Sequence, residues 1–374
     1  MNLKCTTFLQ MAEDIKNNKK EIVMFGAGVI GQVSAPEILA ECNLLKNIKC
    51  YIDNSSKMWG TQIEIKGYFY DTKSPAILNE CGSNTVILIN ISRFAEVIEQ
   101  LEDMDATADM DVYIMPMMLI HNMCLKPSAG SPIMSDKMLI PKVIHYMWFG
   151  RKPIPDTLRR CMDTWREFCP DYEIVEWNED NYDVNKHPYM AQAYEQGAYG
   201  FVPDYARLDI LYNHGGIYFD TDVQLIKNID QLLYQEAFSG VEKWQVLTLG
   251  CGTGAVKGHR MIKKLLDLRE KISFIDKKGN INKNTCGFYD TRVILDEGYK
   301  MNGTTQCVGG MNIYAYDYFQ PMDYMSGQLN VTENTYAIHN YNGGWMDESM
   351  KKQNEVTAQR YKKLYDLAQE DAGK

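Results

Sequence analysis

Two aspartates separated by one residue are the side chains in this sequence best suited to chemistry. Asp220 and Asp222 follow an apolar run in the stretch GIYFDTDV, residues 216–223. Because side chains of a β-strand alternate between its faces, a strand through this stretch places both carboxylates on one face, about 6–7 Å apart. Like charges this close disfavour each other unless a cation or hydrogen-bond donors lie between them. The pattern predicts a site for Mn²⁺ or Mg²⁺, with two solvated aspartates at a strand end as the alternative.

A second charged pair precedes the aspartates in a helix-like segment. Asp204 and Arg207 are three residues apart and therefore share one face of a helix. Gly215 and Gly216 are expected to end that helix before the strand begins. A guanidinium can bind phosphate oxygens through paired hydrogen bonds, and a carboxylate can accept hydrogen bonds from sugar or ribose hydroxyls. The pair is a candidate for binding a sugar phosphate, although an ion pair within the helix explains the same spacing.

A glycine-rich turn lies near the start of the chain. Gly26, Gly28 and Gly31 in FGAGVIG have the G-x-G-x-x-G spacing after an apolar run, and Asp53 follows the next such run. Glycines let the backbone approach a phosphate, the following helix offers free N–H groups, and the acid can bind ribose hydroxyls. The turn predicts binding of NAD(P) or another nucleotide, with a tight strand-to-helix turn that has no ligand as the alternative.

Strand-like and helix-like segments alternate around these candidates in two separate blocks. Four short apolar runs in the first block predict a parallel, Rossmann-like α/β sheet over residues 1–125. Residues 126–138 are rich in Pro, Ser and Gly and form the expected linker. A second α/β alternation then predicts a domain over residues 139–374. The four apolar runs occupy residues 21–25, 48–53, 85–90 and 111–116.

Composition limits the kinds of partner. The chain has 374 residues, 45% of them hydrophobic, which is enough for two buried cores. A net charge of −10 without a run of Lys or Arg argues against a nucleic-acid partner. Ten cysteines without a C-x-x-C pair indicate neither a zinc site nor a redox motif. Since no signal peptide or stretch of roughly 20 apolar residues is visible, we expect a cytoplasmic protein, with peripheral attachment at the inner face of a membrane left open.

Three separated motifs in the second block resemble glycosyltransferase family 32. They are IPKVIHYMWFG at 140–150, FVPDYARLDILYNHGGIYFDTDV at 201–223 and AIHNYNGGW at 337–345. The family includes capsular-polysaccharide transferases and fungal mannosyltransferases. The resemblance implies a GT-A type nucleotide-diphospho-sugar transferase fold for the second block.

The resemblance also implies roles for the charged residues. Trp148 is similar to the family tryptophan that stacks on the donor base. Asp204 and Arg207 match the D-x-x-R motif, which contacts the donor ribose or sugar and the diphosphate. Asp220 and Asp222 match the D-x-D motif, with Asp222 as the direct metal ligand and Asp220 bridging the metal and the ribose. We therefore expect Asp220, Asp222 and Arg207 to carry the catalysis.

A late Asn- and Gly-rich segment completes the expected site. In similar folds a late loop supplies a third metal ligand, for which His339 is the candidate and Asn340 the substitute. Trp345 resembles a family tryptophan whose indole N–H meets a phosphate. Together with Gly343 it is expected to bind the donor as this loop closes.

Taken together, these features predict a metal-dependent retaining glycosyltransferase that transfers a hexose from a nucleotide-diphosphate sugar. The donor is expected to be a UDP-hexose first and GDP-mannose second. The acceptor is expected to be a saccharide or lipid-linked saccharide in surface polysaccharide biosynthesis. Two alternatives stay open: an NAD-dependent sugar-nucleotide oxidoreductase that uses the N-terminal glycine-rich turn, and a non-catalytic protein that binds nucleotide sugars.

Overall fold

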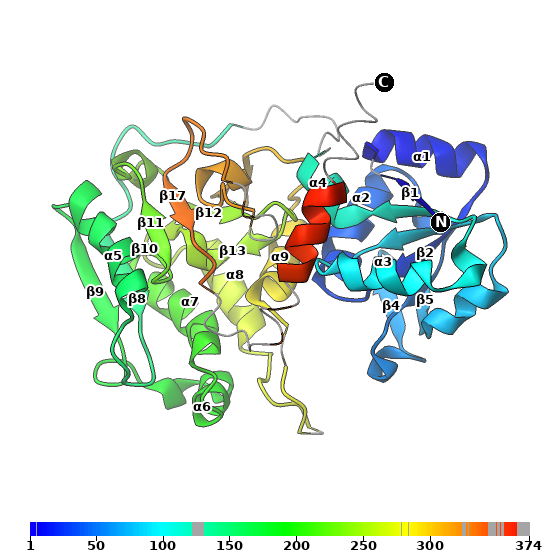
Figure 1. The fold of residues 1–374 in the computed structure, drawn as a ribbon. Helices are drawn as coiled ribbons and strands as arrows, with labels where there is room; N and C mark the ends of the chain where they lie inside the picture. Colours follow the sequence, from blue (N-terminus) through cyan, green and yellow to red (C-terminus); the bar gives the residue numbers. More distant parts are fainter. Residues whose placement is uncertain are drawn as a thin grey trace.

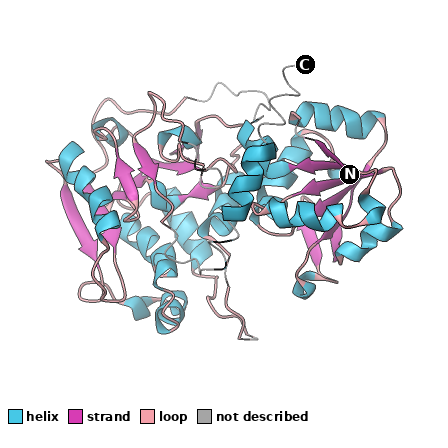
Figure 2. Cartoon of the chain, viewed as in Figure 1, coloured by secondary structure: helices cyan, strands magenta, loops and turns pink. Residues whose placement is uncertain are grey.

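Most strands of the chain form one large sheet in each half, with helices packed on both (Figure 1) (Figure 2). The structure is a computed structural model, and the α/β class expected from the sequence is confirmed. It describes residues 1–4, 6–121, 131–277, 279–282, 284–323, 327, 329–342, 349, 352 and 355–364, except for the side chains at 120 and 121.

The sheet of the first half has the strand order β4-β5-β3-β2-β6-β7-β1. All its pairings are parallel except that of β4 with β5. Counted from β2 over the parallel strands alone, without β4, the order β5-β3-β2-β6-β7 is the 3-2-1-4-5 arrangement of Rossmann-like folds, so that expectation is confirmed. The strands are β1 Asn2–Lys4, β2 Glu21–Phe25, β3 Ile48–Ile52, β4 Gln62–Ile65, β5 Tyr68–Lys73, β6 Thr85–Ile89 and β7 Asp111–Ile114.

Helices of the first half follow the glycine-rich turn and the later strands. The segment after β2 starts as a π-helix, Ile30–Ser34, in which the Ala35 N–H bonds to the Ile30 carbonyl. Pro36 lies in the first turn of the helix that follows, where its missing N–H costs little. The α-helices are α1 Phe8–Asn17, α2 Ala35–Glu41, α3 Phe94–Glu102 and α4 Met115–His121. The 3₁₀ turns are Leu45–Asn47, Ser56–Met58, Pro75–Glu80 and Asp105–Thr107.

The sheet of the second half is mixed. Its order is β15-β16-β12-β14-β10-β8-β9, with β13 paired to β12. Strand β14 runs antiparallel to both of its neighbours, so β10 and β12 point in the same direction. These strands are β8 Val143–Met147, β9 Glu173–Trp177, β10 Gly216–Tyr218, β12 Ala237–Val241, β13 Leu247–Thr248, β14 Thr253–Ala255, β15 Gln306–Val308 and β16 Met311–Tyr314.

A separate two-stranded sheet joins β11, Val223–Leu225, to β17, Ala337–His339. The long helices of this half are α5 Asp156–Phe168, α6 Pro188–Glu195, α7 Pro203–His214, α8 Arg260–Arg269 and α9 Cys286–Asp296. The 3₁₀ turns are Val184–Lys186, Tyr199–Phe201, Asp230–Leu233, Leu249–Cys251 and Tyr316–Tyr318.

His145 on β8 fixes the entry of β10 into the sheet. Its Nε2 lies 2.9 Å from the Gly215 carbonyl oxygen, and its Nδ1 lies 3.1 Å from the indole nitrogen of Trp177. Because an indole N–H can only donate, Nδ1 is the acceptor and the proton is on Nε2. The ring is therefore neutral, and burial lowers its pKa to about 4.

The two halves contact each other and share the end of the chain. Ser34 Oγ donates to the Trp244 carbonyl at 2.8 Å, which joins the segment before α2 to the second half. Residues 355–364 are helical and return to α3 of the first half (Figure 1). There Arg360 pairs with Glu99 at 2.8 Å, and Tyr361 packs on Phe94.

In the part of the chain that the structure describes, none of the helices is long and apolar enough to cross a bilayer.

Candidate functional site

The D-x-D motif lies in a turn rather than in a strand. Strand β10 ends at Tyr218, and the turn at residues 221 and 222 is closed by the Val223 N–H donating to the Asp220 carbonyl at 3.1 Å. The expectation that one strand carries both carboxylates by simple alternation is therefore wrong. The physical reason is pairing: β10 follows β8 only to Tyr218, and the chain then turns so that β11 can pair with β17.

The β11–β17 ladder brings His339 to the aspartates. Val223 lies opposite His339 in this register, and the preceding Asp222 has its Oδ1 3.2 Å from His339 Nε2. One potential ligand atom each from Asp220, Asp222 and His339 lies within 4.8 Å of the others. Two carboxylate oxygens and one imidazole nitrogen form a set that suits Mn²⁺, while Mg²⁺ prefers oxygen alone.

Charge at this cluster favours a cation. Burial alone would raise the pKa of Asp222, but His339 and the Asn342 N–H, which donates at 2.9 Å, lower it overall. Burial alone would lower the pKa of His339, but Asp222 and Asp220 raise it overall. The raised pKa of His339 and the lowered pKa of Asp222 thus both reflect a site that favours positive charge, which a divalent ion would supply. His339 Nδ1 is buried and has no hydrogen-bond partner among the described residues.

Arg207 on α7 lies directly behind the cluster and is held in one orientation. Its Nε donates to the Pro203 carbonyl at 2.9 Å, and its Nη2 donates to Asp204 Oδ1 at 3.0 Å. Its Nη1 lies 3.8 Å from Asp220 Oδ2, and its guanidinium lies over the Tyr218 ring. Burial alone would lower the pKa of Arg207, but Asp220, Tyr218 and Asp204 raise it. The guanidinium therefore presents a fixed positive charge beside the aspartates.

Asp204 is almost fully buried, although the sequence predicts that it contacts the donor. It is 5% exposed, and Oδ2 accepts a hydrogen bond from the Tyr189 hydroxyl at 3.0 Å while Oδ1 binds Arg207. Arg269 lies 3.8 Å from the same carboxylate and pairs with the buried Asp290 at 2.8 Å. The structure thus brings Asp204 to Arg207 and gives both of its oxygens partners within the protein.

Tyr218 and Gly250, to which the sequence assigns no role, contact Asp220. The Asp220 N–H donates to the Gly250 carbonyl at 2.7 Å, and the Tyr218 hydroxyl donates to Asp220 Oδ1 at 2.8 Å. A Cβ atom on Gly250 would lie 1.9 Å from Asp220 Oδ2. Only glycine leaves room for the carboxylate here. The signal was the glycine-rich stretch after residue 249, whose partner could not be read from the sequence.

Trp148 follows β8 and is partly exposed. Its backbone N–H donates to the Trp177 carbonyl at 3.0 Å, and its indole N–H donates to the Lys152 carbonyl. The indole nitrogen therefore has a partner within the protein, which fixes the orientation of the ring.

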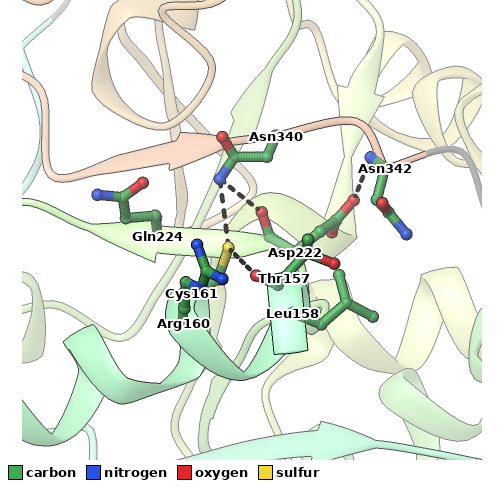
Figure 3. Close-up of a pocket in the computed structure, with 8 residues that line it drawn as sticks. All are labelled: Thr157, Leu158, Arg160, Cys161, Asp222, Gln224, Asn340 and Asn342. Atoms are coloured by element: carbon green, nitrogen blue, oxygen red, sulfur yellow. Dashed lines mark hydrogen bonds between the residues drawn. The ribbon is translucent and has the colours of Figure 1, made fainter. Parts of the chain in front are cut away.

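Asp222 also lines a pocket of about 430 Å³ between the start of α5 and the loop after β17 (Figure 3). Asn340 binds the Asp222 carbonyl through its backbone N–H and its side chain, at 3.0 and 3.1 Å. The side-chain nitrogen of Asn340 also lies 3.5 Å from Cys161 Sγ on α5. The pocket gives a ligand access to one side of the acidic cluster.

The remaining predicted residues lie elsewhere or outside the described residues. Gly343 and Trp345 are outside the described residues. In the first half, both carboxylate oxygens of Asp53 accept backbone hydrogen bonds, from Ala27 at 3.0 Å and Ser55 at 2.8 Å.

The glycine-rich turn itself is tightly closed. A Cβ atom on Gly31 would lie 2.0 Å from the Gly26 carbonyl oxygen, while nothing lies within 4 Å of the corresponding position on Gly28. This close approach explains why residue 31 is a glycine without any need for a ligand. It agrees with the alternative interpretation, a tight strand-to-helix turn that binds no nucleotide. Binding of NAD(P) or another nucleotide at this turn stays a prediction.

Comparisons with known proteins point to the same segment. Residues 155–239 match the family model described as "Glycosyltransferase sugar-binding region containing DXD motif". Inositol phosphoceramide mannosyltransferase 3 of Schizosaccharomyces pombe is 32% identical over 103 residues, which cover 26% of this chain and 29% of that protein. Inositol phosphoceramide mannosyltransferase 2 of the same yeast is 29% identical over 201 residues, which cover 45% of this chain and 56% of that protein.

A looser likeness relates 43% of the chain to 71% of a solved structure titled PaToxG Glycosyltransferase, with 20% identity and a TM-score of 0.34. The chain thus spans less than a third of the first yeast relative and little more than half of the second. The family match begins just before α5 and includes α7, the D-x-D turn and part of β12. Over this segment, the chain is similar to the glycosyltransferases that carry a DXD motif.

Proposed function

We propose that the chain is a metal-dependent, retaining hexosyltransferase that uses a nucleotide-diphosphate sugar as donor. The observation that carries the proposal is the convergence of Asp220, Asp222 and His339 within 4.8 Å, next to the fixed guanidinium of Arg207. An acidic, metal-binding cluster beside a buried positive charge suits a diphosphate, because both recognise phosphate oxygens.

The residues have separate tasks in this mechanism. Asp220, Asp222 and His339 would hold Mn²⁺ or Mg²⁺, which supplies Lewis-acid stabilisation of the departing diphosphate. As the glycosidic bond breaks, negative charge grows on the phosphate oxygen, and Arg207 stabilises it without having to reorient. Trp148, at the end of the neighbouring strand, would stack on the donor base.

The identity of the donor and acceptor belongs to the same proposal. The two yeast relatives are named as mannosyltransferases that act on inositol phosphoceramide. Their names favour a mannosyl donor such as GDP-mannose. This donor therefore stands beside the UDP-hexose that the sequence predicts. The names also support an acceptor linked to a lipid, which would bring the protein to the inner face of a membrane by peripheral attachment.

The direct test is turnover of nucleotide sugars with and without Mn²⁺. We expect the purified chain to hydrolyse or transfer the sugar of GDP-mannose or a UDP-hexose only when Mn²⁺ or Mg²⁺ is present. Asp222→Asn should lower this turnover at least about 100-fold, since it removes one charged ligand. Asp267→Asn is the control, because that carboxylate lies on the outer face of α8 in an exposed pair with Lys263.

The two alternative functions predict other outcomes in the same assay. Oxidation of NADH in the presence of a sugar nucleotide would support the oxidoreductase. Binding of sugar nucleotides that raises the melting temperature without any turnover would support the non-catalytic binding protein. Either result, with no metal-dependent turnover for any donor, would overturn the proposed reaction.

A further inference from the structure

The chain turns sharply just after β17, where it passes the acidic cluster. Tyr341 has a φ of 45°, in the left-handed backbone region that residues with a Cβ atom rarely adopt. The residues on either side of it hold Asp222. The Asn340 N–H donates to the Asp222 carbonyl at 3.0 Å, and the Asn342 N–H donates to Asp222 Oδ2 at 2.9 Å (Figure 3). Strained backbone persists only where the surrounding contacts hold it, so the Tyr341 side chain must be held in place.

The Tyr341 ring packs against the imidazole of His339. The two ring centroids are 4.2 Å apart, and the ring planes are inclined by 46°. His339 Nε2 lies 3.2 Å from Asp222 Oδ1, while its buried Nδ1 has no hydrogen-bond partner among the described residues. In metal-binding histidines a hydrogen bond to the second ring nitrogen commonly fixes the orientation of the ring. Because the described residues supply no such bond, packing against Tyr341 is the contact that can orient this imidazole.

The hydroxyl group of Tyr341 is anchored to a buried glutamine. It donates to Gln320 Oε1 at 2.5 Å, and Gln320 is fully buried. Gln320 Nε2 in turn donates to Thr248 Oγ1 on β13, and the Thr248 hydroxyl donates to the Val246 carbonyl at 3.3 Å. A hydroxyl group has a single hydrogen to donate, so Thr248 Oγ1 accepts from the amide nitrogen. This direction leaves the amide oxygen of Gln320 facing Tyr341.

Thr248 connects these bonds to the other side of the acidic cluster. Strand β13 pairs with β12 of the large sheet, and a 3₁₀ turn follows it directly. In that turn the Gly250 carbonyl accepts the Asp220 N–H at 2.7 Å. Gln320 therefore joins the loop that follows His339 to the segment that holds Asp220.

We propose that Tyr341 and Gln320 are positioning residues that hold His339 where it can bind one Mn²⁺ ion together with Asp220 and Asp222. This inference rests on the proposed metal-dependent transfer. The ring contact and the buried hydrogen bond offset the backbone strain at Tyr341, and without them the loop would relax and the imidazole would lose its orientation. Both residues act through His339, so they set the affinity for the ion and leave the chemistry of the loaded site unchanged.

The test is Tyr341→Phe, which keeps the ring against His339 and removes the hydroxyl that reaches Gln320. Mn²⁺ is titrated into the full chain without nucleotide sugar, and free Mn²⁺ is followed by its electron paramagnetic resonance signal. We expect the Kd for Mn²⁺ to rise about 10-fold or more, since losing a partner of a metal ligand typically costs about 10–100-fold in affinity. At saturating Mn²⁺, kcat should stay within about threefold of wild type. Tyr336→Phe is the matched control, because its hydroxyl also donates to a glutamine, Gln231, at 2.9 Å, but before the start of β17.

The readouts separate failure of this inference from failure of the proposed function. If the wild-type chain binds no Mn²⁺, the proposed metal site is wrong and this inference with it. If the wild type binds Mn²⁺ but turns over no sugar nucleotide, the proposed reaction fails, and the Kd still decides the role of Tyr341.

Three results would overturn this role alone. The first is a Kd of Tyr341→Phe within about threefold of wild type. The second is an equal loss of affinity in Tyr336→Phe, which would indicate general loosening of β17. The third is a loss of kcat that persists at saturating Mn²⁺, which would indicate a direct part in the reaction. Should Tyr341→Phe not fold, Gln320→Met removes the same hydrogen bond from its other end, and an unchanged Kd would then contradict the inference.

Discussion

Gly250→Ala is the substitution that tests the geometry of the acidic cluster most directly. The added Cβ would lie 1.9 Å from Asp220 Oδ2 and 2.8 Å from Arg207 Nη1. Gly250 is not in the left-handed backbone region, so alanine itself is not strained there. The whole effect must therefore come from contact with the Asp220 and Arg207 side chains.

The size of the effect follows from the displacement. The Asp220 oxygen has to retreat by about 1.5 Å to reach an ordinary contact distance of 3.4 Å. Because a misplacement of about 1 Å can cost about 100-fold in rate, we expect kcat/KM for Mn²⁺-dependent turnover to fall at least that much. The Asp220 side chain is 32% exposed and can move outward, so the free energy of unfolding should fall by less than the roughly 1–3 kcal/mol typical of overpacking.

The assay compares metal-dependent turnover and thermal unfolding of Gly250→Ala with those of Gly82→Ala. Gly82 has nothing within 4 Å of its Cβ position and does not require a positive φ, so the same substitution there should change neither measurement. Apparent Mn²⁺ affinity, measured by titration, should weaken in Gly250→Ala alone. A folded Gly250→Ala protein that keeps turnover within threefold of wild type would refute the reasoning, because Asp220 would then not need its present position.

Three further predictions concern stability. Asp290→Asn removes the closer charged partner of the fully buried Arg269 guanidinium and leaves only Asp204, 3.8 Å away, so it should cost about 3–5 kcal/mol in urea unfolding; a cost below about 1 kcal/mol would contradict this. The pKa of His145 is about 4 in the folded protein and 6.5 in the unfolded chain. Between these pH values only the unfolded chain binds the additional proton, so the stability of the folded protein falls as the pH falls. Between pH 7.5 and 4.5 the wild type should therefore lose about 2–3 kcal/mol more than His145→Gln, and equal losses would disprove it. Tyr361→Ala removes a buried ring from Phe94 and should cost about 3–5 kcal/mol, measured by denaturant unfolding; an unchanged midpoint would show that residues 355–364 contribute no stability.

Local patterns predicted the elements well because their causes are local. The helix-like segment and the two glycines that follow it located α7, Pro203–His214, and the entry into β10. Four apolar runs located four of the parallel strands of the first half, β2, β3, β6 and β7, each buried on both faces. The length of β10 was predicted wrongly because a strand ends where its partner does, and the sequence does not show which segments pair.

The site itself depends on pairings between distant parts of the chain. His339 reaches Asp222 only through the β11–β17 ladder, and Gly250 reaches Asp220 only because its loop leads into β14, beside β10. A bare histidine in an Asn-rich segment and a glycine in a loop carry no local sign of these contacts.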